Sequence, residues 1–185
     1  MNTKNDIEKY AEKKLEDQLI AGTDHFRRVY SNAKKIAKKA SINYDDIILH
    51  AACYLHDIEQ EEPHAEKSAI EAEKILNSLS FPKEKIHLVQ KAIMSHLPES
   101  KPIHKEGVLL HDADLIEFLG TVGLTRVSIA SREWFKAKDM ATVLDTLKRY
   151  RKLYDNLILK ESKNFAKNKT IVMDLFIKQL EEELK

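Results

Sequence analysis

The sequence is poor in the residues that interrupt or cross-link a chain. Its 185 residues include one cysteine, four glycines, four prolines and one tryptophan. A single cysteine, Cys53, cannot form an internal disulfide, which excludes a disulfide-stapled framework. So few glycines and prolines also argue against an all-β fold, which needs many turns. The absences therefore favour helices held together by an ordinary hydrophobic core.

Long apolar runs and an excess of one charge are also missing. No apolar stretch approaches the roughly 20 residues of a membrane-spanning helix, and the first fourteen residues are too polar for a signal peptide. We therefore expect a cytoplasmic location and no membrane partner. The 31 Lys and Arg residues nearly balance the 30 Asp and Glu residues, so the composition gives no support for binding extended nucleic acid.

What the sequence does contain is helical periodicity over most of its length. Hydrophobic residues make up 43% and charged residues 33%, as in globular proteins, and the length suits one domain with a full core. We predict an all-α fold, a single-domain helical bundle over residues 1–185, with a core of about 20–130 and C-terminal helices of about 131–185 packed on it. The expected helices are about 5–20, 24–40, 44–57, 64–79, 82–96, 108–119, 140–160 and 163–184.

Local signals predict where these helices begin and end. Thr23 and Asn43 are expected to cap the helices that follow them. The helix of about 44–57 is apolar nearly all round, which predicts a central, buried position for it, with Cys53 as a small core residue. Residues 97–107 are expected to form a loop, and Gly120 is expected to close the helix of about 108–119.

Four residues of the kind that bind metal ions occur in these helices. His56 and Asp57 end the central helix, His25 borders the apolar face of the preceding helix, and Asp114 shares a helix face with Leu110 and Phe118. Imidazole suits Zn, Fe, Ni and Cu, and carboxylate adds Mg and Mn. Each residue alone can also be interpreted without a functional role, as a core histidine or as a charged group at a helix surface. Together they predict a mixed nitrogen and oxygen site for a divalent ion.

Two more histidines extend this pattern. His64 begins the helix after an acidic loop and His96 ends the next helix, so both lie where loops gather around a cavity. They are candidates for a second metal ion or for binding a substrate phosphate, with exposed cap residues as the alternative. The remaining histidines have no supporting context, and we interpret them as surface or packing residues.

The order of these residues resembles the HD-domain superfamily of metal-dependent phosphohydrolases. The segment DHFRRVYSNAKKIA is similar to the family's opening helix, and AACYLHDIE is similar to its central apolar run ending in His-Asp. DADLIEFLGTVGLTR resembles a stretch found in a bacterial subgroup of predicted HD hydrolases. The resemblance covers about residues 20–130. It implies that His25, His56, Asp57 and Asp114 bind metal, that Asp112 supports them, and that His64 and His96 bind a second ion.

The resemblance implies a reaction as well as a fold. We expect a phosphohydrolase that uses water activated by one or two divalent ions (Mn, Fe, Ni, Co, Zn or Mg) to cleave a phosphate mono- or diester of a nucleotide or similar small molecule. Asp57 is the expected catalytic carboxylate. Arg28, one turn after His25, and Arg126, which matches the subgroup motif, are expected to bind phosphate, although either could form a surface ion pair instead.

Some features leave alternatives open. Many family members have glycine two residues after the His-Asp pair, where this chain has Glu59, and the extended signature of cyclic di-GMP phosphodiesterases is missing. A non-catalytic HD module that binds a nucleotide or a partner protein, a di-iron HD-type oxygenase and a plain helical scaffold are the competing hypotheses. The amphipathic C-terminal helices could pack on the domain or form a homodimer.

Overall fold

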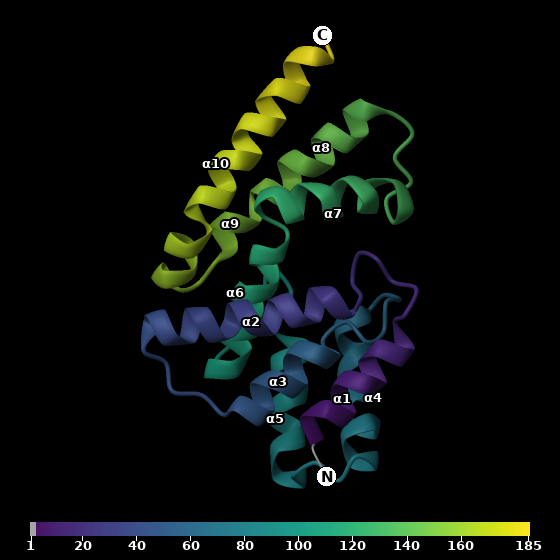
Figure 1. Ribbon diagram of the computed structural model, residues 1–185, viewed down its shortest axis with the longest axis vertical. Coiled ribbons are helices and arrows are strands. Elements are labelled where there is room, and N and C mark those ends of the chain that lie inside the picture. Colours follow the sequence, from purple (N-terminus) through teal and green to yellow (C-terminus); the bar gives the residue numbers. More distant parts are fainter. Residues whose placement is uncertain (1–2) are drawn as a thin grey trace. The chain divides into compact units, whose positions relative to one another are not determined.

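The computed structural model describes residues 3–185, and these residues form helices and no strand (Figure 1). The all-α prediction is confirmed. The chain divides into two compact units, a first unit of Met1–Ala113 and a second unit of Asp114–Lys185. The prediction of one domain over residues 1–185 stays a prediction. None of the described helices combines the length and the apolar composition needed to cross a bilayer.

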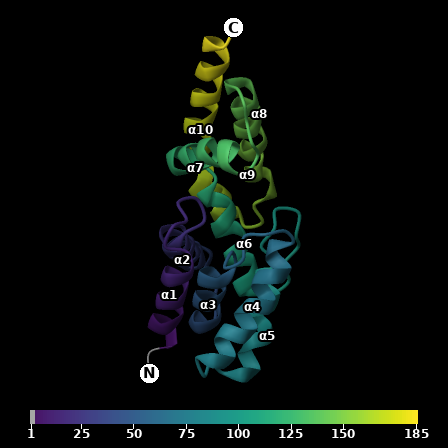
Figure 2. The same ribbon diagram turned by 90° about the vertical axis from the view of Figure 1, so that its right-hand side faces the viewer.

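The first unit is built around helix α3 (Asp46–Leu55), which packs against four other helices. Every α3 residue from Ile48 to Leu55 is buried, which confirms the predicted central position and the core role of Cys53. Figure 2 shows α4 and α5 running side by side next to α3. The four helices that surround α3 are α1 (Thr3–Lys14), α2 (Thr23–Ala40), α4 (His64–Ser78) and α5 (Lys83–Met94).

The start of α3 differs from the prediction. The cap is Asp45 and not Asn43, because the Asp45 side chain accepts a hydrogen bond from the Ile47 backbone N–H at 3.1 Å. The Asp45 backbone N–H in turn donates to Glu106 at 2.7 Å, and Lys85 donates to the Asp45 carboxylate at 2.6 Å. Asp45 therefore fixes the N-terminal end of α3 through contacts with Lys85 and Glu106, while His56 lies at the other end of the helix.

Three other predictions in the first unit were wrong. Helix α1 ends at Lys14 and not near residue 20, so that Leu19 lies outside the helix and is 73% exposed. The residue that precedes α2 is Gly22, which makes no side-chain cap, and Thr23 is already helical. Helix α6 (Lys105–Glu117) begins three residues earlier than predicted and shortens the preceding loop.

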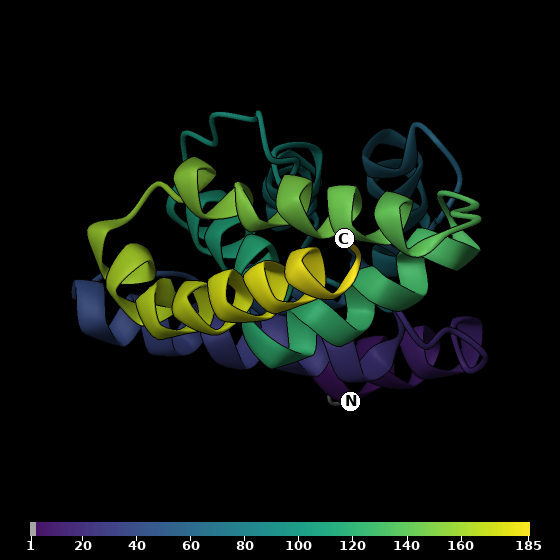
Figure 3. The same cartoon turned by 90° about the horizontal axis from the view of Figure 1, so that it is seen from above.

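The second unit contains α7 (Gly120–Glu133), α8 (Met140–Arg151), the short α9 (Leu153–Asn156) and the long α10 (Lys160–Glu183). Helices α8 and α10 run antiparallel and side by side (Figure 3). Ion pairs of Arg151 with Asp174, at 2.7 Å, and of Lys148 with Glu181, also at 2.7 Å, join them. Both helices also pack on α7.

Helix α7 was missed in the sequence because Gly120 was interpreted only as the end of the preceding helix. Gly120 has φ of +74° at the corner between α6 and α7, a conformation that favours glycine. A Cβ at Gly123 would lie 2.2 Å from the Phe118 backbone. The two glycines therefore permit a tight turn into a new helix, and Gly120 begins α7 instead of only closing α6.

Candidate metal centre

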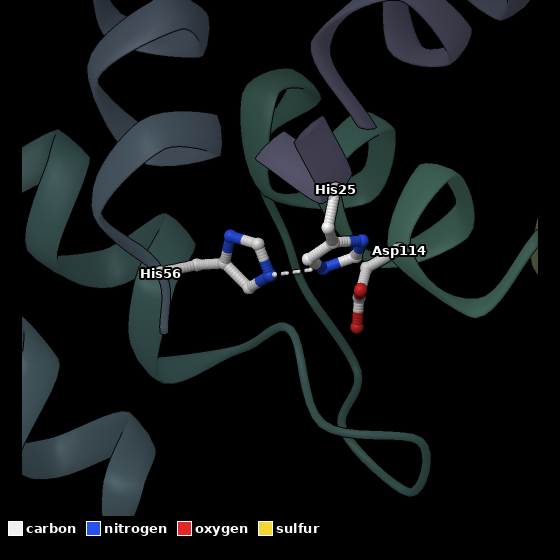
Figure 4. Close-up of side chains that lie close together, drawn as sticks. All are labelled: His25, His56 and Asp114. Atoms are coloured by element: carbon white, nitrogen blue, oxygen red, sulfur yellow. Dashed lines mark hydrogen bonds between the residues drawn. The ribbon is translucent and has the colours of Figure 1, made fainter. Parts of the chain in front are cut away.

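Three predicted ligands form a buried group at the end of α3. His25, His56 and Asp114 each present a ligand atom within 4.8 Å of the others, and all three side chains are buried. His25 comes from the first turn of α2, His56 directly follows α3, and Asp114 lies on α6. Figure 4 shows the two imidazoles pointing toward each other beside the Asp114 carboxylate. Their Nε2 atoms are 3.4 Å apart. We call these three residues the inner group.

Asp57, His64 and His96 form a second group of the same kind, which we call the outer group. Their ligand atoms also lie within 4.8 Å of one another. Asp57 Oδ1 is 3.4 Å from His96 Nε2 and 3.7 Å from His64 Nε2. Asp57 and His64 are partly exposed, whereas His96 is buried. The structure thus brings together the two extra histidines that the sequence placed at separate helix ends.

The Asp57 carboxylate lies between the two groups. While its Oδ1 faces His64 and His96, its Oδ2 is 3.6 Å from Nε2 of His56. The His56 and His96 rings are 5.1 Å apart in an edge arrangement. One carboxylate therefore presents one oxygen to the two histidines of the outer group and the other oxygen to His56 of the inner group.

Backbone carbonyls orient two of the imidazoles. His56 Nδ1 is 3.0 Å from the carbonyl oxygen of Cys53, and His96 Nδ1 is 2.6 Å from that of Ile93. Because a carbonyl only accepts hydrogen bonds, Nδ1 must carry the proton in each ring. In the neutral ring, Nε2 then keeps its lone pair and points into the ligand groups, as metal-binding histidines require.

A carboxylate orients the third imidazole. His64 Nδ1 is 3.1 Å from Glu62 Oε1, and the His64 backbone N–H donates to Glu62 Oε2 at 3.3 Å. Burial raises the pKa of Glu62, but these hydrogen bonds outweigh that effect and hold the pKa below its usual value. A carboxylate behind a histidine fixes the ring and increases the basicity of its other nitrogen.

The loop between Asp57 and His64 is held at several points. The buried Ser68 hydroxyl donates to the Glu59 carbonyl at 3.2 Å and accepts from the Glu59 N–H at 3.1 Å. The Gln60 side chain donates to the Asp57 carbonyl at 2.8 Å. The Glu59 carboxylate accepts from Lys14 at 2.7 Å, and this hydrogen bond raises the pKa of Lys14. Glu59, the departure from the family pattern, is thus tied to the end of α1.

The other four histidines differ in burial. His50 and His111 are buried, His104 is half-buried and His87 is exposed. His111 Nδ1 lies 3.1 Å from the buried carboxylate of Asp112. That Asp112 supports the metal ligands stays a prediction.

The two predicted phosphate-binding arginines differ in their surroundings. Arg28 is partly exposed on α2, one turn after His25. Arg126 is 5% exposed on α7, where its Nη1 donates to the Glu117 carbonyl at 3.1 Å and its guanidinium lies 4.5 Å from the centre of the Phe118 ring. These contacts stabilise the end of α6 and give Arg126 a structural role. Phosphate binding by either arginine stays a prediction.

Comparison with known protein families finds a match that covers much of the first unit. Residues 22–119, more than half of the chain, match the family model described as HD domain. This range includes the six predicted ligands and Arg28, and it ends before Arg126. A comparison with curated proteins found no match.

Solved structures resemble this chain along nearly its whole length. A protein from Lactobacillus plantarum has a TM-score of 0.80 and 22% identity, with 98% of this chain and 96% of that chain covered. YpgQ from Bacillus subtilis, solved in complex with ADP, has a TM-score of 0.76 and 20% identity, with 97% of both chains covered. An HD-superfamily hydrolase from Bacillus thuringiensis has a TM-score of 0.72 and 22% identity, with 98% and 96% covered. At these identities the likeness establishes the fold.

Proposed function

Because the chain belongs to the HD-domain family, we propose that it is a metal-dependent phosphohydrolase that cleaves a phosphate mono- or diester of a nucleotide or a similar small molecule. The observation that carries the proposal is the position of Asp57, one of whose carboxylate oxygens faces His64 and His96 while the other faces His56. The ADP bound to B. subtilis YpgQ, which shares the fold, supports the choice of a nucleotide.

The residues of both groups fit divalent ions. Two nitrogens that bind one ion at about 2.0–2.1 Å with a tetrahedral angle lie about 3.4 Å apart, and the Nε2 atoms of His25 and His56 are separated by 3.4 Å. Neutral imidazoles with carboxylates form a donor set that suits Mn, Fe, Co, Ni and Zn. We propose that His25, His56 and Asp114 hold one ion, that His64 and His96 hold a second, and that Asp57 binds both.

The chemistry of the site follows from its charges. Bound divalent ions supply Lewis acidity toward the phosphoryl oxygens and make hydroxide available near neutral pH. The Asp57 carboxylate also accepts a hydrogen bond and so orients the attacking water. The carbonyls of Cys53 and Ile93 keep the His56 and His96 rings from rotating, which holds the ligand atoms in place without reorganisation. Arg28 is the cation that we expect to neutralise the substrate phosphate, because of its position next to His25.

The proposal is tested by metal content and activity together. The protein is purified without chelator and its metals are measured, for the wild type, Asp57→Ala and His87→Ala. His87, exposed on α5, is the matched control. We expect two equivalents of a transition metal in the wild type and the control, and a loss from both groups in Asp57→Ala. The same proteins are then assayed on nucleoside mono-, di- and triphosphates and on nitrophenyl phosphate mono- and diesters.

The outcomes separate the competing functions. Hydrolysis by the wild type and by His87→Ala, abolished in Asp57→Ala, supports the phosphohydrolase. Bound metal without turnover of any ester would indicate a binding module, and bound iron with consumption of O₂ would indicate an oxygenase. An Asp57→Ala protein that keeps full metal content and full activity would contradict the proposal.

A further inference from the structure

Helix α10 exposes an apolar surface that its own unit does not cover. Ile171, Val172, Leu175 and Phe176 are 49%, 39%, 65% and 44% exposed. Positions i, i+1, i+4 and i+5 lie on one side of a helix, so the four side chains form a continuous band about two turns long. We call these four residues the α10 band.

The band lies opposite the face by which α10 joins the rest of the second unit. That inner face carries buried residues at helical spacing, which are Ser162, Ala166, Thr170, Met173 and Ile177. One apolar face is sufficient to hold a helix on its unit. A second apolar face on the opposite side has no function in packing the unit, and an exposed apolar patch of this kind marks an interaction site.

The charges around the band are asymmetric along the helix. The part of α10 before the band carries Lys160, Lys163, Lys167 and Lys169 against Glu161, and the part after the band carries Glu181, Glu182 and Glu183 against Lys178. Within the chain, Glu181 also pairs with Lys148 and Glu182 with Lys178, so the excess of acid after the band is smaller than the excess of base before it. The band lies between these parts, with Asn168 before it and Gln179 after it. A second α10 turned end for end would set each basic part against an acidic end, with the bands facing each other.

We infer that the α10 band is the interface of a homodimer in which two copies of α10 pair antiparallel about a two-fold axis near Val172 and Leu175. A surface of this kind is self-complementary, as the interface of a two-fold dimer must be. A parallel pair would instead oppose lysines to lysines and acids to acids, which is unfavourable. The helix is about 36 Å long at 1.5 Å per residue, which gives two copies room to pair over several turns.

The first test measures the mass of the full-length protein in solution by light scattering and by sedimentation over a range of concentrations. The wild type should be a dimer, with twice the 21.4 kDa of one chain. Leu175→Asp should raise the dimer dissociation constant at least about a hundredfold, because a two-fold interface contains the substitution twice. Leu19→Asp, which changes another exposed leucine, is the control and should remain dimeric. Unchanged circular dichroism of both variants verifies that each has folded.

The second test exchanges the charges. Lys163→Glu with Lys167→Glu makes both ends of α10 acidic, and Glu182→Lys with Glu183→Lys makes both ends basic. Each variant should dimerise more weakly than the wild type, and an equimolar mixture of the two should form a heterodimer. Raised salt should weaken the heterodimer by screening the charges.

The third test establishes the direction of pairing. In the antiparallel arrangement, position 168 of one copy faces position 179 of the other. Asn168→Cys mixed with Gln179→Cys should therefore form a crosslink between the two variants on oxidation, faster than either forms with itself, while the buried Cys53 does not react. A monomeric wild type at high concentration, a dimer unaffected by Leu175→Asp, or preferential crosslinking of identical positions would overturn the inference.

Discussion

The inner and outer ligand groups use the same residue types in different surroundings. All three side chains of the inner group are buried, with His56 fully inaccessible and packed 5.2 Å from the Phe26 ring. In the outer group, the side chains of His64 and Asp57 are 24% and 18% exposed. Burial excludes water and holds ligands rigidly, while exposure admits a substrate. Under the proposed function, the inner group would anchor the site and the outer group would meet the phosphate ester.

The largest effect is expected from the inner group. His56→Ala removes a ligand of the inner ion and a packed side chain from beside Phe26, so we expect loss of the inner metal equivalent and an activity loss of more than about a thousandfold, equal to several kcal/mol of transition-state stabilisation. Metal analysis and steady-state kinetics measure both effects. His87→Ala controls for the general loss of a histidine, and an active, fully metal-loaded His56→Ala protein would refute the assignment of the inner group.

Loss of an outer ligand should have a smaller effect. We expect His64→Ala to lose one metal equivalent and to retain the other, because Asp57 is the only residue that the proposal assigns to both ions. Activity should fall about a hundredfold or more, with the fold unchanged in circular dichroism. Loss of both equivalents would show that the two groups do not bind independently.

The order in which a chelator removes the two ions tests the difference in burial between the inner and outer groups. A limiting amount of chelator should remove the outer equivalent first and the inner equivalent much more slowly, because the inner ligands are shielded from solvent. Metal remaining on the protein is measured against time after rapid desalting. Simultaneous loss of the two ions, or faster loss of the inner one, would contradict the interpretation.

Substitution of Glu62, which orients the His64 ring, should have a moderate effect on the outer group alone. Glu62→Gln keeps the shape of the side chain but removes the charge, and a loss of about 10–100-fold in affinity for the outer ion is expected from the loss of such a supporting contact. Glu61→Gln, next to it in the same loop, is the matched control. Competition with a metal indicator measures the affinity, and an equal effect of the two substitutions would exclude a specific role for Glu62.

The smallest effect concerns the far end of α3. Burial raises the pKa of Asp45, but hydrogen bonds from Lys85 and from the Ile47 N–H outweigh burial and lower it. Ionised Asp45 therefore stabilises the fold above its ordinary pKa, and this contribution is lost as the pH falls through the lower folded-state pKa. Asp45→Ala should cost about 1 kcal/mol at pH 7. Urea unfolding measures the free energy of unfolding of both proteins. The difference between wild type and Asp45→Ala should shrink below about pH 4, and a difference that stays constant with pH would contradict a stabilising role for ionised Asp45.

The sequence predicted the helices best where apolar spacing was continuous. Helix α3 was assigned to the centre because its side chains are apolar all round, and the structure confirms it. Helix α7 was missed because Gly120 and Gly123 look like breakers until the close approach of the Phe118 backbone is known. That approach depends on a tertiary turn, which the local sequence does not record, although Leu124, Val127 and Ser131 have helical spacing.

The candidate site was predicted as a set of residues but not as an arrangement. The order of the histidines and aspartates selected all six ligand candidates, and the structure brings them together in two groups. The sequence did not indicate that Asp57 would face both groups, since this depends on how the chain turns after Leu55. It also gave no signal for Glu62 behind His64 or for the carbonyls behind His56 and His96, because backbone contacts are independent of residue type.

Those two carbonyls have a consequence for proton transfer. A ring whose Nδ1–H is bound to a carbonyl, and whose Nε2 faces a ligand group, has no free position for exchanging protons with a substrate. His56 and His96 are therefore excluded as general acids, although histidine is the residue most often used in that role. Under the proposed function, the proton of the leaving oxygen would therefore come from a group other than these two histidines.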